Sequence, residues 1–101
     1  MDIKISGLEE SVVTVSFIGR FDTTSFISVN EQIEPVLEVA EKTIVLDCSE
    51  LTYISSSGLR SFLTIRKASQ AKGGRVVIKG MNDTIRSVFM MTGFLNLFEV
   101  E

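Results

Sequence analysis

The sequence predicts a single α/β domain in which a mixed, mostly parallel sheet packs against helices. The spacing of apolar residues switches several times between two and about 3.6 residues, which indicates alternating strands and helices. Two short, uninterrupted apolar runs, Ile44–Leu46 and Val76–Ile78, have the length of buried strands. A chain of 101 residues suits one hydrophobic core. Residues 1–101 are therefore expected to form one domain with the order β-β-α-β-α-β-α-β.

The first two strands are predicted to be half-buried and joined by a hairpin. Residues 3–5 and 13–17 alternate apolar and polar side chains, as strands with one covered face do. Gly7 to Glu10 is expected to connect them. Gly19-Arg20 is expected to end the second strand.

A helical spacing follows from Thr24. One face of this predicted helix carries Phe26, Val29, Ile33, Val36, Leu37 and Ala40. Pro35 removes one internal hydrogen bond, but the apolar face keeps its phase across it. One kinked helix is therefore favoured over two separate helices.

The second half of the chain is predicted to add parallel strands by right-handed crossovers. The run Ile44–Leu46 suits a central strand covered on both faces, ending at Asp47 and followed by a loop. The next helical face is expected to end near Ser69, before a stop at Gly73-Gly74, and it consists of Leu59, Phe62, Leu63 and Ile65.

A third helix and a short strand are expected to close the fold. Asn82 or Asp83 can cap this helix, and Gly93 lies just beyond it. Its apolar face consists of Ile85, Val88, Phe89 and Thr92. Leu97 to Val100 is the expected closing strand. Met90, Met91 and Phe94 exceed what one helical face needs, and are either core or a patch for a partner.

Composition excludes several classes of function. A net charge of −3 argues against nucleic-acid binding, which needs clustered Lys and Arg. The chain has no histidine, the commonest general base and metal ligand, and its one cysteine, Cys48, is expected to be a small buried residue. Lys67, the remaining candidate base, is expected on a helix away from the serines, so no catalysis, metal or cofactor is expected.

Two further features bear on the location of the chain. Its start lacks the basic and apolar regions of a signal peptide, and no apolar run approaches the roughly 20 residues of a membrane span. A cytoplasmic chain without membrane insertion is the expectation.

The most informative stretch is the serine cluster Ser55-Ser56-Ser57-Gly58, which leads from the loop after a buried strand into a helix. Sites of parallel α/β folds lie beyond the carboxyl ends of strands. The first turn of a helix offers free N–H groups that would accommodate a phosphate on serine. The alternative is structural, because serine is also a common N-cap residue.

Two aspartates are expected at strand ends as well. Asp22 and Asp47 could face the same end of the sheet, beside the serines, where they would orient backbone or help to recognise a partner. The alternative is that each caps a turn.

The motif Leu46-Asp47-Cys48-Ser49, followed by Ile54-Ser55-Ser56-Ser57-Gly58-Leu59, resembles the signature of STAS domains, specifically bacterial anti-sigma factor antagonists. Three other segments resemble this family in order and spacing: Gly19-Arg20-Phe21-Asp22, Gly73-Gly74, and Thr92-Gly93-Phe94 with Leu97-Phe98. The resemblance covers essentially the whole chain and implies a STAS fold.

The resemblance also implies a function. In the family, an anti-sigma factor that is a serine kinase phosphorylates the first serine after the motif aspartate, and that position maps onto Ser56. The surface that binds this partner is expected to include Ser56 together with Ser55, Ser57, Gly58, the exposed Arg60, Asp22 and Asp47. The motif aspartate itself is Ser55 here, which leaves the Ser56 hydroxyl in place but changes its electrostatic surroundings.

Two alternatives remain open at this point. A STAS domain that is not phosphorylated can be an accessory or scaffold subunit, for example of a membrane transport complex. A sensor of a small molecule or nucleotide would use the end of the sheet near Asp22 and Asp47.

Overall fold

Five strands form one sheet, and they lie in it in the order of the chain. The computed structural model describes residues 1–101. The strands are β1 (Asp2–Ser6), β2 (Val12–Phe21), β3 (Thr43–Ile54), β4 (Arg75–Lys79) and β5 (Glu99–Val100). β1 is antiparallel to β2 and every other pair is parallel. The predicted α/β class is confirmed, and the two apolar runs are neighbours in the sheet, with Ile44 opposite Val76.

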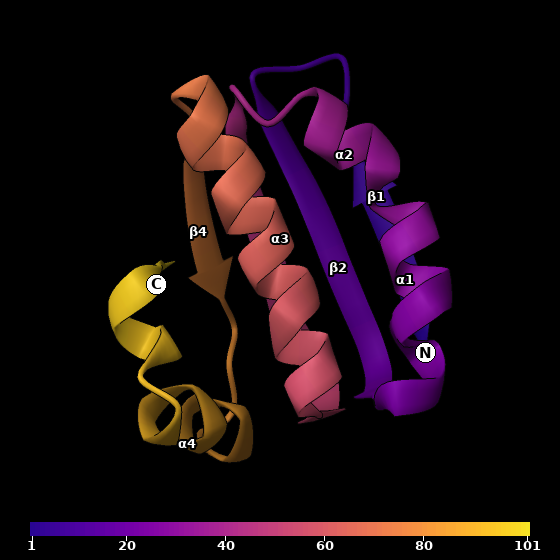
Figure 1. Ribbon diagram of the computed structural model, residues 1–101, viewed down its shortest axis with the longest axis vertical. Coiled ribbons are helices and arrows are strands. Elements are labelled where there is room, and N and C mark those ends of the chain that lie inside the picture. The colour runs from indigo at the N-terminus through magenta and orange to yellow at the C-terminus, as the bar shows by residue number, and fades with distance from the viewer.

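The helices lie on one face of this sheet (Figure 1). They are η1 (Thr23–Ser25), α1 (Phe26–Gln32), α2 (Glu34–Glu38), α3 (Ser56–Lys72), α4 (Asp83–Met91) and η2 (Phe94–Leu97). Each crossover from β2 onwards leads to the next strand along the sheet, so right-handed connections all pass over the same side. The longest helix, α3, lies between β2 and β4 in this view and runs alongside the strands, while α1 and α2 lie over β1.

The expectation that β3 is covered on both faces is wrong. Ile44, Leu46 and Cys48 point into the core, whereas Val45 and Asp47, which alternate with them, are only partly buried. Since no helix crosses the other face, that face of β3 is left partly open to solvent. The core between sheet and helices contains packed aromatic rings: the centre of the Phe62 ring lies 4.7 Å from that of Phe17, at a tilt, and 5.5 Å from that of Phe89, edge to face.

The predicted kinked helix is two short helices. Ile33 N–H still donates to Val29 O at 3.0 Å, but the next bond, from Val36 N–H, goes to Ile33 O at 2.9 Å. Pro35 has no N–H and stands in the first turn of α2, where a helix needs no such donor. Val29, Ile33 and Val36 are nevertheless all buried, so the apolar face continues through the break.

Both central strands are longer than predicted. β2 does not end at Gly19-Arg20 but at Phe21, and β3 does not end at Asp47 but continues to Ile54. The pairing of β3 with β2 shifts register at two places, one of them beside Gly19, whose φ is +96°. At each shift β3 contains one more residue than the facing part of β2. Its buried side chains there are Cys48, Leu51 and Ile54, three residues apart, which hides the strand from a search for alternation.

The end of the chain also differs in part from the expectation. Of the predicted strand Leu97–Val100, Leu97 is the last residue of η2, and only Glu99 and Val100 form a strand, β5. Asn82, one of the two predicted caps of the third helix, accepts a bond from Ile85 N–H at 2.8 Å. The stop at Gly73 is also confirmed, because this glycine ends α3 in the left-handed conformation, with φ +74°.

Candidate functional site

The serine cluster lies where β2 and β3 end together and α3 begins. Phe21 pairs with Ile54, and Ser55 N–H donates to Phe21 O at 2.8 Å. The chain then enters α3 at Ser56 without an intervening loop. The strand ends therefore fix the backbone that carries the serines.

The three serines have three different positions. Ser55 is the N-cap: its Oγ accepts from Gly58 N–H at 3.2 Å. Ser56 is the first residue of α3 and is exposed, whereas Ser57 is 8% exposed. Only Ser56 therefore presents its hydroxyl freely, and the alternative of capping applies to Ser55.

Gly58 brings α3 close to the strand ends. A Cβ at this position would lie 2.7 Å from Ile54 Cγ1 and 2.9 Å from Phe21 Cγ. Both distances are shorter than van der Waals contact. The glycine of the motif thus has a packing role directly beneath the serines.

Asp22 lies beside Ser55, because it follows Phe21 in the neighbouring strand. Its Oδ1 accepts from Thr24 Oγ1 at 2.7 Å, from Ser25 Oγ at 3.0 Å and from Ser25 N–H at 3.2 Å. The hydrogen bonds from Thr24 and then Ser25 lower the pKa of Asp22. Its carboxylate caps the turn η1.

Asp47 does not lie with Asp22, so the expectation that the two face the same end of the sheet is wrong. Because β3 continues to Ile54, Asp47 is roughly 20 Å up the strand, at about 3.3 Å per residue, where it pairs with the last residue of β4. Its Oδ1 accepts from Ser49 Oγ at 2.8 Å and from Ser49 N–H at 3.0 Å. Burial raises the pKa of Asp47, but the bonds from Ser49 and the charge of Lys79 outweigh it, so that the pKa is lowered.

Two arginines lie over aromatic rings near the serines. The guanidinium carbon of Arg60 is 4.9 Å from the centre of the Phe26 ring, and that of Arg20 is 4.3 Å from the centre of the Tyr53 ring. Arg20, Tyr53 and Phe26 were not predicted as site residues. No local pattern signals them, because each contact joins residues more than thirty positions apart.

We call this surface the serine end, and it consists of Asp22, Ser55, Ser56, Ser57, Gly58 and Arg60. Cys48 is not part of it: the thiol is buried, as predicted, and burial raises its pKa to about 12. Met90 and Met91 on α4 are 58% and 86% exposed, so they are not core. Phe94, half-buried, packs against the core with its ring 6.4 Å from that of Phe89.

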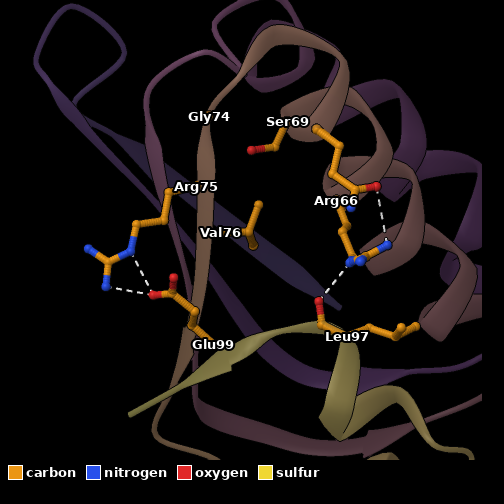
Figure 2. A pocket seen from close by; sticks show the side chains of 8 residues that line it. Arg66, Ser69, Gly74, Arg75, Val76, Leu97 and Glu99 are labelled. Atoms are coloured by element: carbon orange, nitrogen blue, oxygen red, sulfur yellow. Dashed lines mark hydrogen bonds and ion pairs between the residues drawn. The ribbon is translucent and has the colours of Figure 1, made fainter.

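A pocket of about 230 Å³ lies towards the other end of α3 (Figure 2). Its arginines are bonded to the chain itself: Arg66 Nε donates to Leu97 O at 2.6 Å, and Arg75 Nε to Glu99 Oε2 at 2.6 Å. We call this region the arginine end, and it consists of Arg66, Ser69, Gln70, Gly74, Arg75, Leu97 and Glu99. These bonds tie the C-terminal segment to α3 and β4.

No group of three or more His, Cys, Asp or Glu side chains is placed to hold a metal ion. None of the helices combines the length and the apolar character that crossing a membrane requires.

Residues 7–101 match the family model of the STAS domain. The chain belongs to the STAS domain family. A similar protein from Bordetella bronchiseptica, named as a candidate anti-sigma factor antagonist, BtrV, is 38% identical over 74 residues. That alignment covers 69% of this chain and 64%, less than two thirds, of the Bordetella protein. The anti-sigma-B factor antagonist of Listeria monocytogenes is 24% identical over 102 residues, covering all of this chain and 89% of that protein.

Solved structures show the same STAS fold. SpoIIAA in its unphosphorylated form, an anti-sigma factor antagonist, superposes with a TM-score of 0.75 at 18% identity, covering 99% of this chain and 87% of that chain. A candidate antagonist from Thermotoga maritima gives 0.84 at 18% identity, with coverages of 98% and 83%. A sulfate transporter family protein from Wolinella succinogenes gives 0.74 at 20% identity, with coverages of 89% and 75%.

Proposed function

We propose that this chain is an anti-sigma factor antagonist that binds a kinase-type anti-sigma factor through the serine end. Phosphorylation of Ser56 would release it. The observation that carries the proposal is the position of Ser56: its side chain is exposed, while strand pairing and the Ser55 cap fix its backbone. The names of the Bordetella and Listeria relatives support the same role.

Ser56 is a suitable acceptor for a kinase. The hydroxyl loses its proton and receives a phosphoryl group from ATP held by the partner, leaving ADP. The product carries about −1.5 to −2 charges at neutral pH, at the positive end of a helix dipole. The helix start therefore tolerates the modification, and the folded domain persists in both states.

The same phosphate opposes binding of the partner. In the unmodified state, the serine end offers a hydroxyl, a capped helix start and a guanidinium over a ring. An unmatched charge within a protein interface costs several kcal/mol, because both partners lose the water that solvates it. Phosphorylation thus acts as a local electrostatic switch.

The proposed docking surface includes Asp22, which lies beside Ser55, but not Asp47. The Asp47 carboxylate is bonded to Ser49 well up the strand. The replacement of the motif aspartate by Ser55 leaves the helix capped, since serine and aspartate are equally good N-caps. Such a function places the chain in the cytoplasm, where sigma factors act.

The test uses the purified chain and a kinase-type anti-sigma factor from the same organism. Calorimetry is expected to show binding in the presence of ADP. Incubation with ATP is expected to add one phosphate, located at Ser56 by mass spectrometry, and to abolish binding. Ser56→Ala removes the acceptor and should keep the complex intact in ATP. Absence of binding, or phosphorylation confined to another residue, would refute the proposal.

A transport complex is the second candidate partner, favoured by the fold shared with the Wolinella sulfate transporter family protein. That role predicts binding to a membrane protein with no phosphate on Ser56. The sensor alternative loses its expected site, because Asp22 and Asp47 lie far apart.

A further inference from the structure

Arg60 lies one helical turn after Ser56, on the same side of α3. Side chains four residues apart on a helix are neighbours, with their Cβ atoms about 5–6 Å apart. Both side chains are exposed. The guanidinium of Arg60 is therefore within reach of a group attached to the Ser56 hydroxyl.

The donors of Arg60 are weakly engaged. One terminal nitrogen lies 3.5 Å from Ser57 Oγ, at the outer limit of a hydrogen bond, and the Phe26 ring supplies the other contact. No carboxylate pairs with Arg60, since the one ion pair of the structure joins Arg75 and Glu99. Arg60 is exposed and Phe26 is half-buried at the surface, so the cation is held loosely and Arg60 can change its partner.

Other charged groups near the start of α3 are engaged or turned to solvent. Arg20 lies over Tyr53, and the carboxylate of Asp22 accepts three hydrogen bonds within η1. Glu31 on the packed helix α1 is exposed to solvent. Ser55, next to Ser56, is neutral. Asp22, beside Ser55, keeps its negative charge, so a phosphate on Ser56 needs a nearby cation, and Arg60 is the one that α3 supplies within reach.

We propose that Arg60 is the intramolecular counter-ion of a phosphate on Ser56, and that it leaves the Phe26 ring to bind this phosphate. The inference rests on the proposed function and adds a second component to the switch. Modification introduces negative charge and also withdraws a cation from the η1–α1 side of the surface. A partner that recognises the guanidinium over Phe26 would then lose two features at once.

The test places phosphoserine at position 56 during translation, by an expanded genetic code, so that neither kinase nor partner is needed. Phosphorus NMR follows the second ionisation of the phosphate, whose usual pKa is about 6. A neighbouring cation favours the dianion and lowers this pKa. Arg60→Gln is expected to raise it by roughly half a unit, and Arg60→Lys to restore part of the shift.

The matched control is Lys67→Gln, which removes the same charge from the same helix but at a position about 16 Å along it from Ser56. Its phosphate pKa should equal that of the parent protein. The helix dipole acts on the phosphate in every variant, so the difference isolates Arg60. Equal pKa values in the parent and Arg60→Gln would overturn the proposal.

The Phe26 ring gives a second readout. Its NMR signals in the phosphoserine protein should move to the positions they take in unmodified Arg60→Gln, because both proteins lack the guanidinium over the ring. Unchanged signals would contradict the exchange. These results do not depend on a kinase. If a kinase failed to modify Ser56, the proposed function would be refuted, but the pKa values measured for the phosphoserine protein would still test the role of Arg60.

Discussion

The two ends of α3 use the same kinds of residue in opposite ways. At the arginine end, Arg66 and Arg75 donate to Leu97 O and to Glu99, and so bind the C-terminal segment to the body of the domain (Figure 2). At the serine end, Arg60 rests on a ring and the hydroxyl of Ser56 is exposed. The backbone is fixed at both ends, but only the serine end keeps polar groups available to a partner.

A glycine allows close packing at each end of α3, against backbone atoms at the arginine end and against side chains at the serine end. A Cβ on Gly74 would lie 2.0 Å from the backbone oxygen of Ala40, whereas on Gly58 it would meet the side chains of Ile54 and Phe21. A backbone atom can shift less readily than a side chain to relieve a clash with an added Cβ. The arginine end should therefore be the less tolerant of substitution.

The largest effect is expected for Gly74→Ala. The added methyl group overlaps a backbone oxygen that cannot move without shifting the turn that leads into β3, and should cost about 3 kcal/mol of unfolding free energy. Urea denaturation of the variant measures this. A loss below about 0.5 kcal/mol, the usual range of surface changes, would contradict the account of the arginine end.

An intermediate effect is expected at the cap of α3. Ser55→Ala leaves Gly58 N–H without its acceptor and should lower the unfolding free energy by about 1 kcal/mol. Ser55→Asp restores the residue of the family motif and should cost nothing, because aspartate caps equally well. Equal denaturation midpoints for Ser55→Ala and the parent protein would show that this cap is not needed.

The same substitution at both ends tests the comparison itself. Arg66→Gln loses the bond to Leu97 O, and should cost roughly 0.5–1 kcal/mol and loosen the C-terminal segment, as amide exchange of Phe98 to Val100 would show. Arg60→Gln should change the unfolding free energy less. A larger loss at Arg60 would mean that the serine end is also held by its arginine.

The smallest change in stability is expected for Arg60→Glu. The side chain is exposed and unpaired, so the unfolding free energy should move by less than about 0.5 kcal/mol. Binding of the anti-sigma factor should nevertheless weaken, because the guanidinium belongs to the docking surface. Thermal denaturation and calorimetry on the same sample separate the two effects, and unchanged affinity would remove Arg60 from that surface.

The sequence predicted the order of elements because local patterns determine it: apolar runs mark β3 and β4, and helical spacing marks α3 and α4. Prediction from the sequence failed where the length of a strand depends on its pairing with a neighbouring strand. The extension of β3 depends on two extra residues accommodated against β2, which no local pattern contains. That extension separates Asp47 from Asp22, so an error in strand length became an error in the site.

The motif predicted where the three serines lie in the fold, but not the role of each serine. Any of three adjacent serines could cap α3, and only the position of the helix start assigns the cap to Ser55 and exposure to Ser56. The contact of Arg20 with the Tyr53 ring likewise depends on the register of β2 against β3, and that of Arg60 with the Phe26 ring depends on the packing of α1 against α3. Long-range contacts of this kind require the folded chain.

The central claim, that charge on Ser56 decides partner binding, is tested most directly by calorimetry of Ser56→Asp with the kinase-type anti-sigma factor. Asp at a helix N-terminus is favourable by about 0.3–1 kcal/mol, so the variant should remain folded. Ser56→Ala should bind like the parent, and Thr64→Asp, which adds the same charge two turns along α3, is the matched control. The account predicts at least a roughly 100-fold weaker complex for Ser56→Asp alone. Parent-like affinity of Ser56→Asp would contradict it.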